Sequence, residues 1–267
     1  MDTHVTVKQI TFDSANTYAV AGTKSVTLES DTAAMNAQIN VIQGSHQFQA
    51  VVNLGSSADI FTAPGTMLSF NNALNLHGET VTKTGDGTLE INNRVAAAGG
   101  SIDCQAGTCS GSGTVGGDLN NSGGTVSPGN SPGMLEVEGD FTQEAEGSLL
   151  MEIAGLDSGS QYDVLQVEGL AALSGTLQVA LLDAFEPSAG NRFEIFEFGD
   201  VVGDFDSVVL PALPGGLQWD DSALLASGIL SMVPEPGSVL LMLTALAGLY
   251  ACGARSTVSA SPLHHLT

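Results

Sequence analysis

Residues 79–93 read ETVTKTGDGTLEINN and contain two short runs of alternating residues joined by a glycine turn. In ETVTKT and in TLEIN, apolar or β-branched residues alternate with polar ones, as they do in strands with one buried face. The TGDG sequence between them supplies two glycines for a tight turn, because glycine accepts the positive φ values that such turns need. The segment therefore predicts two strands separated by a sharp corner.

Similar runs occur on both sides of this segment, namely SVTLES, MLSFNN, GMLEVEGD and GTLQVALL. Their central apolar positions are Val26 or Leu28, Leu68, Leu89, Leu135 and Leu177. From Leu68 onward the spacings are 21, 46 and 42 residues, close to multiples of about 21–23. A repeat of this length fits one rung of a β-solenoid. We therefore predict an all-β chain with a parallel β-helix, or solenoid, over residues 1–140; the alternative is a sandwich whose strands merely look alike.

The motif around the turn is similar to a known repeat. Lys83, Gly85, Gly87, Thr88 and Leu89 match the Lys-x-Gly-x-Gly-Thr-Leu core of the autotransporter-associated β-strand repeat. This resemblance covers some 15–25 residues and implies a passenger-like β-helix. Autotransporters also end in a membrane β-barrel, which this sequence lacks, so the resemblance does not imply self-export through an outer-membrane pore.

Residues 141–232 continue the strand-rich pattern after SPGNSPG (127–133), whose two Pro-Gly pairs fit type II turns. SPGNSPG, YDVLQVEGLAALSGTLQVALL (162–182) and VGDFDSVVLPALPGGLQWD (202–220) are similar to the last module of bacterial exported β-helix proteins. We expect 141–232 to form a compact all-β module. It would cap the solenoid end, whose unpaired strand edges would otherwise invite association.

The composition is strongly acidic, with 6 Lys and Arg against 29 Asp and Glu and a net charge of −23. Six basic residues are too few to form a positively charged surface along a nucleic-acid backbone, so nucleic acid is not expected as a partner. With acidic residues this frequent, a pair of carboxylates is no signal for a glycosidase. The sequence also lacks a nucleophile elbow, a calcium nonapeptide and an EF-hand loop. We expect a protein that is not an enzyme and has no metal or cofactor.

Cys104 and Cys109 lie in SIDCQAGTCSG, which we interpret as a Gly/Ser-rich loop. Cys252 lies in the C-terminal apolar run, so removal of that tail would leave an even number of cysteines. Two interpretations stay open: a small disulfide formed in an oxidising compartment, or two free thiols on a loop. A zinc site would need ligands that this segment does not hold.

Residues 233–267 begin VPEPGSVLLMLTALAGLYACGARS. The apolar run 239–252 has about 14 residues, or roughly 21 Å as a helix. A comfortable membrane span needs about 20 residues. Pro234 and Pro236 exclude a regular helix before this run and hold the chain extended. We therefore expect a short hydrophobic helix of the kind found in processing segments.

This layout resembles the PEP-CTERM sorting signal. Pro234, Glu235 and Pro236 match its tripeptide, 239–252 its helix and Arg255 its basic end, here a single arginine followed by a short polar tail. The resemblance implies export, transient insertion of 239–252 in the inner membrane, and processing by an exosortase-type membrane peptidase. Such proteins tend to accompany exopolysaccharide or biofilm production in Gram-negative bacteria. The alternative is a simple tail anchor.

The N-terminal segment MDTHVTVKQITFDSANTY has neither a basic start nor an apolar core of a signal peptide. We therefore expect the sequence to be the C-terminal part of a longer exported protein. The expected function is that of a structural or adhesin-like protein of the cell surface or extracellular matrix, with extracellular polysaccharide as a candidate partner. The alternative is the non-catalytic end of a carbohydrate-active β-helix enzyme.

Overall fold

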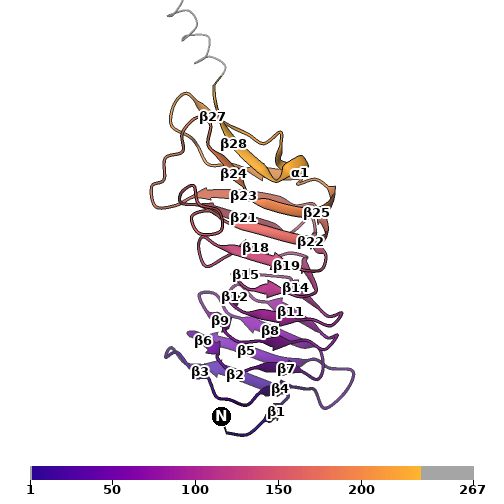
Figure 1. Cartoon of the computed structure of the whole chain (residues 1–267). Coiled ribbons are helices and arrows are strands. Elements are labelled where there is room, and N and C mark those ends of the chain that lie inside the picture. The colour runs from indigo at the N-terminus through magenta and orange to yellow at the C-terminus, as the bar shows by residue number, and fades with distance from the viewer. Residues whose placement is uncertain (1, 236–267) are drawn as a thin grey trace, which may run out of the picture.

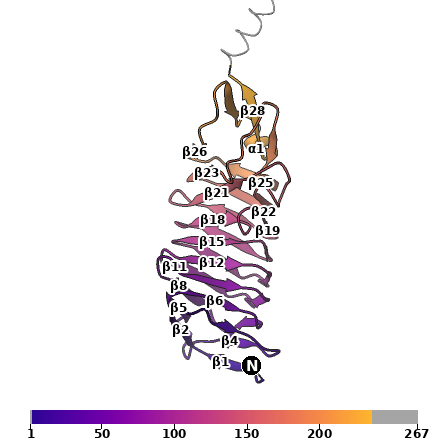
Figure 2. The same ribbon diagram turned by 90° about the vertical axis from the view of Figure 1, so that its left-hand side faces the viewer.

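The computed structural model describes residues 2–235, and it consists mainly of three columns of parallel strands stacked along one axis (Figures 1 and 2). Each turn of the chain adds one strand to each column. The third column has nine strands, which define nine rungs in the described residues. The predicted parallel β-helix is therefore confirmed, and the alternative sandwich is wrong, because every pair of strands within the columns is parallel.

The first column contains β1 (Val5–Val7), β4 (Val26–Leu28), β7 (Val52–Leu54), β10 (Leu74–Asn75), β13 (Arg94–Ala96), β16 (Thr114–Val115) and β19 (Met134–Val137). The second contains β2 (Gln9–Asp13), β5 (Ala37–Gln43), β8 (Ala58–Thr62), β11 (Thr80–Thr84), β14 (Ser101–Cys104), β17 (Asp118–Asn121) and β20 (Phe141–Gln143). The third contains β3 (Ala19–Val20), β6 (Ser45–Phe48), β9 (Met67–Phe70), β12 (Thr88–Ile91), β15 (Thr108–Gly111), β18 (Thr125–Pro128), β21 (Ser148–Ile153), β23 (Thr176–Leu181) and β26 (Ser207–Val209).

The first two columns merge in the last rungs. β22 (Val164–Leu173) pairs with β19 through its first half and with β20 through its second half. β25 (Phe196–Gly203) then pairs along β22. The first two columns thus form one 16-stranded sheet.

The solenoid extends beyond the boundary expected at residue 140. Phe141 lies in β20 and pairs in parallel with Leu119 below it and Ala171 above it. Parallel pairing continues to β26, where Val209 pairs with Gln178. The boundary was placed too early because the Pro-Gly turns at 127–133 form a corner within the stack and not a domain junction.

The register of the third column confirms one part of the repeat prediction and corrects another. Leu68 and Leu89 are partners in adjacent rungs and are both fully buried. Leu135, by contrast, lies in the first column and pairs with Leu165. Its spacing from Leu89 is therefore not a whole number of rungs.

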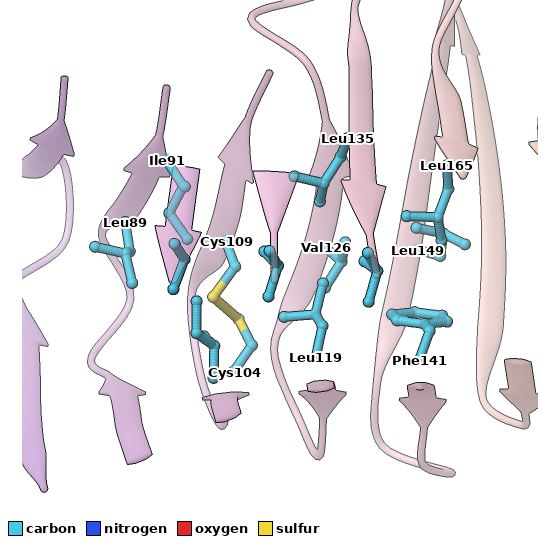
Figure 3. Close-up of a cluster of buried hydrophobic side chains, with 14 of the residues drawn as sticks. Leu89, Ile91, Cys104, Cys109, Leu119, Val126, Leu135, Phe141, Leu149 and Leu165 are labelled. Carbon is cyan, nitrogen blue, oxygen red and sulfur yellow. A yellow bond between two sulfur atoms is a disulfide. The ribbon is translucent and has the colours of Figure 1, made fainter. Parts of the chain in front are cut away.

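The interior is filled by every second side chain of each strand, because successive residues of a strand point to opposite faces. Figure 3 shows inward side chains of the second and third columns, among them Leu119, Val126 and Leu149, following one another along the interior. Each such leucine, buried in full, contributes about 1.5–3 kcal/mol. The inward-facing apolar side chains therefore supply most of the driving force for the stacking of the rungs.

One inward position holds a charge. Lys83 is fully buried at the end of β11. Its Nζ donates to the carbonyl oxygens of Thr84 at 3.0 Å, Gly85 at 2.8 Å and Ala106 at 2.9 Å. Burial lowers its pKa from 10.5 to about 8, against a smaller opposing effect of Asp86. The ammonium thus joins the corner of its own rung to the corner of the next.

Some of the acidic residues take part in the stacking. The Asp118 carboxylate accepts a hydrogen bond from the backbone N–H of Asp140 at 3.0 Å. The Asp140 carboxylate accepts one from the N–H of Leu170 at 2.8 Å. A side chain at Gly139 or Gly169 would collide with these carboxylates, so both positions need glycine. These two carboxylates therefore join neighbouring rungs through hydrogen bonds with the backbone.

A small antiparallel sheet covers the C-terminal end of the stack (Figure 1). It consists of β24 (Arg192–Glu194), β27 (Leu217–Asp220) and β28 (Ile229–Pro234), with α1 (Leu224–Ser227) beside β25 and β28. Phe193 is fully buried, and the Trp219 indole N–H donates to the Pro211 carbonyl oxygen at 2.9 Å. This region provides the expected cap, with its first strand at Arg192.

Candidate functional site: a hydroxyl-lined groove

The outward face of the third column carries a row of hydroxyl side chains. Consecutive strand partners in this row are Thr88, Thr108, Thr125, Ser148 and Thr176. All five are half-buried between their neighbours. Because strands in a sheet lie about 4.8 Å apart, the hydroxyl groups repeat at this interval along the axis.

A groove of about 340 Å³ crosses this face. Its floor includes the hydroxyl groups of Thr88, Thr108, Ser110 and Ser127, with Met67 at the β9 end. No residue that lines the groove is aromatic or basic. The surface is thus a polar strip able to donate and accept hydrogen bonds.

A glutamate lies near each end of the groove, Glu90 at one end and Glu152 at the other. Glu90 on β12 accepts hydrogen bonds from the Ser69 hydroxyl at 2.6 Å and from the Asn92 side-chain amide at 2.9 Å. These bonds fix the orientation of the carboxylate. Glu152 lies on β21, three strands further along the column. Three strand spacings separate the strands that carry the two acidic residues by about 14 Å.

One wall of the groove is the corner 129–133. Gly129 and Gly111 exchange two backbone hydrogen bonds of 2.8 and 3.0 Å, which hold the start of the corner against the rung below. Asn130 and Ser131 line the groove, and Ser131 has a φ of +63°. A positive φ is uncommon outside glycine, so this residue is held in place by its surroundings.

Asp163 anchors the far side of the same corner. It is fully buried, and its carboxylate accepts the backbone N–H of Gly133 at 2.7 Å and that of Glu152 at 2.8 Å. Burial raises its pKa from 3.8 to about 7, although the two N–H donors act in the opposite direction. The charge of Glu152 adds to the increase in pKa. Asp163 therefore connects the wall of the groove to the strand that carries Glu152.

The two acidic residues of the groove lie on strands that are more widely spaced than the carboxyl pair of a glycosidase. Glycosidases place their two carboxyl groups about 5–9.5 Å apart across the scissile bond. The strands that carry Glu90 and Glu152 are separated by more than this, about 14 Å. Among residues 2–235, no group of three or more His, Cys, Asp or Glu side chains is placed to hold a metal ion.

The groove was missed at the sequence level, although a signal for it is present. Each hydroxyl residue of the row follows a glycine, in Gly87-Thr88, Gly107-Thr108, Gly124-Thr125, Gly147-Ser148 and Gly175-Thr176. The glycine makes the corner and the next residue begins the strand facing outward. The dipeptide alone does not identify the column, because Gly113-Thr114 also begins β16 in the first column and Gly100-Ser101 begins β14 in the second.

The predicted cysteine pair is brought together in the interior. The structure joins Cys104, at the end of β14, and Cys109, on β15, by a disulfide with a Cα–Cα distance of 6.3 Å (Figure 3). Both side chains are buried among core leucines. The interpretation as a loop is therefore wrong for the cysteines themselves, and only the residues between them form the corner.

The structure describes two residues of the expected sorting signal. Pro234 is the last residue of β28 and pairs with Leu217. The backbone N–H of Glu235 donates to the Gly216 carbonyl oxygen at 2.9 Å, and both side chains are exposed. Pro236, Arg255 and the expected helix 239–252 lie outside the described residues. In the described part of the chain, no helix has the length and apolar character needed to cross a membrane.

No protein-family model matches the chain, and no curated protein matches its sequence significantly. The proposals below therefore depend on the motifs and on the geometry of the chain itself.

Proposed function

We propose that this protein is an exported structural component of the cell surface or extracellular matrix, released from the inner membrane by an exosortase-type peptidase. Its solenoid would present long polar faces to an extracellular polysaccharide. The groove on the third column is the proposed contact surface.

The observation that carries the proposal is the position of the Pro-Glu-Pro tripeptide. The last described strand, β28, ends at Pro234, so the tripeptide begins at the last residue of this strand. Pro234 and Glu235 are exposed at this end. A membrane peptidase needs an extended and accessible segment, and two prolines favour such a conformation.

The test follows a C-terminal tag. The chain is expressed with a secretion signal in a host that carries the sorting enzyme, and the tag and the body are detected separately. We expect the protein that reaches the cell surface to have lost the C-terminal tag. Replacing Pro234, Glu235 and Pro236 by alanine should leave tagged protein in the inner membrane. A matched control replaces Glu144 and Glu146, which lie in an exposed turn, by alanine.

The proposal is wrong if the tag stays on protein that reaches the surface and the triple variant behaves identically. The segment would then be a simple anchor. The second candidate, the non-catalytic end of a carbohydrate-active β-helix enzyme, predicts turnover of a defined polysaccharide by a longer protein that includes catalytic rungs upstream, which the proposed structural role does not.

A further inference from the structure

We infer that the hydroxyl-lined groove binds a neutral polysaccharide lying along the solenoid axis, and that it rejects polyuronates. This inference deepens the proposed function, on which its biological context depends. The binding chemistry itself is carried by the groove and can be tested without export.

The first step is the match of functional groups. Each serine or threonine hydroxyl both donates and accepts a hydrogen bond, whereas a carboxylate accepts several. A sugar ring presents hydroxyl groups that do both. Thr88 and Thr108 offer hydroxyl groups on adjacent strands, and Glu90 is already oriented by Ser69 and Asn92. The groove can therefore pair with sugar hydroxyl groups without first ordering its own acceptor.

The second step is the shape. The lining residues extend from Met67 on β9 to Glu152 on β21, which spans four strand spacings, or about 19 Å. Of the hydroxyl row, Thr88 and Thr108 line the groove, and the row continues outside it at Thr125, Ser148 and Thr176. A ligand that repeats along its length can meet the same group on successive rungs, whereas a small molecule would occupy only part of the strip.

The third step is the charge. The groove has two carboxylates and no lysine or arginine in its lining, and the whole chain carries a net charge of −23. A polyuronate would place its own carboxylates against Glu90 and Glu152, and repulsion would oppose binding. An amine-bearing polymer would be attracted to any acidic surface of the chain, so its binding should weaken with salt. Binding of a neutral chain should depend little on salt.

The experiment measures binding of the full chain to soluble polymers of equal length by calorimetry. The probes are unsubstituted glucans of different linkage, a polyuronate and a glucosamine polymer, each at low and high salt. The groove variant combines Thr88→Val and Thr108→Val, which remove two hydroxyl groups and keep the side-chain shape. The control variant combines Thr82→Val and Thr142→Val, which makes the same change on the second column.

We expect at least one neutral glucan to bind at both salt concentrations and the polyuronate not to bind. The groove variant should weaken the affinity roughly tenfold, whereas the control variant should not change it. The inference is overturned if no glucan binds, if the polyuronate binds as well as the glucan, or if both variants bind alike. None of these results depends on tail processing, so failure here is distinct from failure of the proposed sorting.

Discussion

At the scale of single residues, two buried charged groups account for features that hydrophobic patterning does not explain. Lys83 and Asp163 both bond to backbone groups of more than one rung. A buried charge without partners would be strongly unfavourable, so these bonds offset the cost of burying the two groups. Lys83 was recognisable from its motif. Asp163 was not, because nothing in YDVLQVEG distinguishes a buried carboxylate from an exposed one.

Replacing Lys83 by methionine should destabilise the protein. Methionine keeps most of the volume but leaves the carbonyl oxygens of Thr84, Gly85 and Ala106 without their donor. We expect a loss of about 2 kcal/mol in the free energy of unfolding, measured by urea denaturation. Lys24→Met, at an exposed position, is the control. Equal stability of the two variants would show that the ammonium is not needed at the corner.

Asp163 should make stability depend on pH. Its folded pKa of about 7 lies above the ordinary 3.8, so the folded state binds the proton more tightly than the unfolded state does. The stabilisation from protonation is present in full below about pH 4 and is lost as the pH rises toward about 7. We therefore expect the stability of the protein relative to Asp163→Asn, which does not titrate, to fall over this range.

The measurement is the free energy of unfolding of both proteins at steps between pH 4 and 8. Asp157→Asn, at an exposed position in the same region, should keep the pH dependence of the unchanged protein. A difference between the protein and Asp163→Asn that stays constant with pH would contradict the assignment.

At the scale of strands and corners, the sequence predicted the kind of element well and the register only in part. Alternating runs such as TLEIN predicted strands because inward and outward positions differ in polarity. The spacing of the leucines did not show to which column each strand belongs, because Leu89 and Leu135 occupy inward positions in different columns. Rung length also varies: third-column partners are 20 residues apart from Leu89 to Cys109 and 28 apart from Leu149 to Leu177. A repeat of fixed length therefore does not align the strand partners over several rungs.

The disulfide is a prediction at this scale, because it joins the strands on the two sides of one corner. Non-reducing mass spectrometry of the protein isolated without reductant should find Cys104 linked to Cys109. The loop that it closes is short, so replacing both residues by alanine should remove about 2 kcal/mol of stability, part of it from lost packing in the core. Recovery of two freely alkylated thiols from unreduced protein would support the alternative of free cysteines.

At the scale of the whole molecule, the described residues form a stack in which each rung pairs only with the rungs next to it. Stability in such a protein is approximately a sum of rung and interface contributions. The two ends differ: the antiparallel sheet of β24, β27 and β28 covers one end, while β1, β2 and β3 lie at the other (Figure 1). The position of this sheet could not be predicted from composition, because its strands alternate as those of the solenoid do.

Removing one whole rung should therefore shorten the protein without unfolding it. Deletion of 94–113 removes β13, β14 and β15 and joins Asn93 to Thr114, the residue that pairs with Arg94 in the intact stack. Thr88 would then meet Thr125, and Leu89 would meet Val126, so the outward hydroxyl row and the inward apolar row both stay continuous. We expect a folded β protein by circular dichroism, less stable than the parent and shorter by about 4.8 Å in small-angle scattering. Deletion of 94–103 is the control: it removes only part of a rung, brings strands of different columns together and should prevent folding. If both deletions unfold the chain, the rungs are not interchangeable units and stability depends on contacts beyond nearest neighbours.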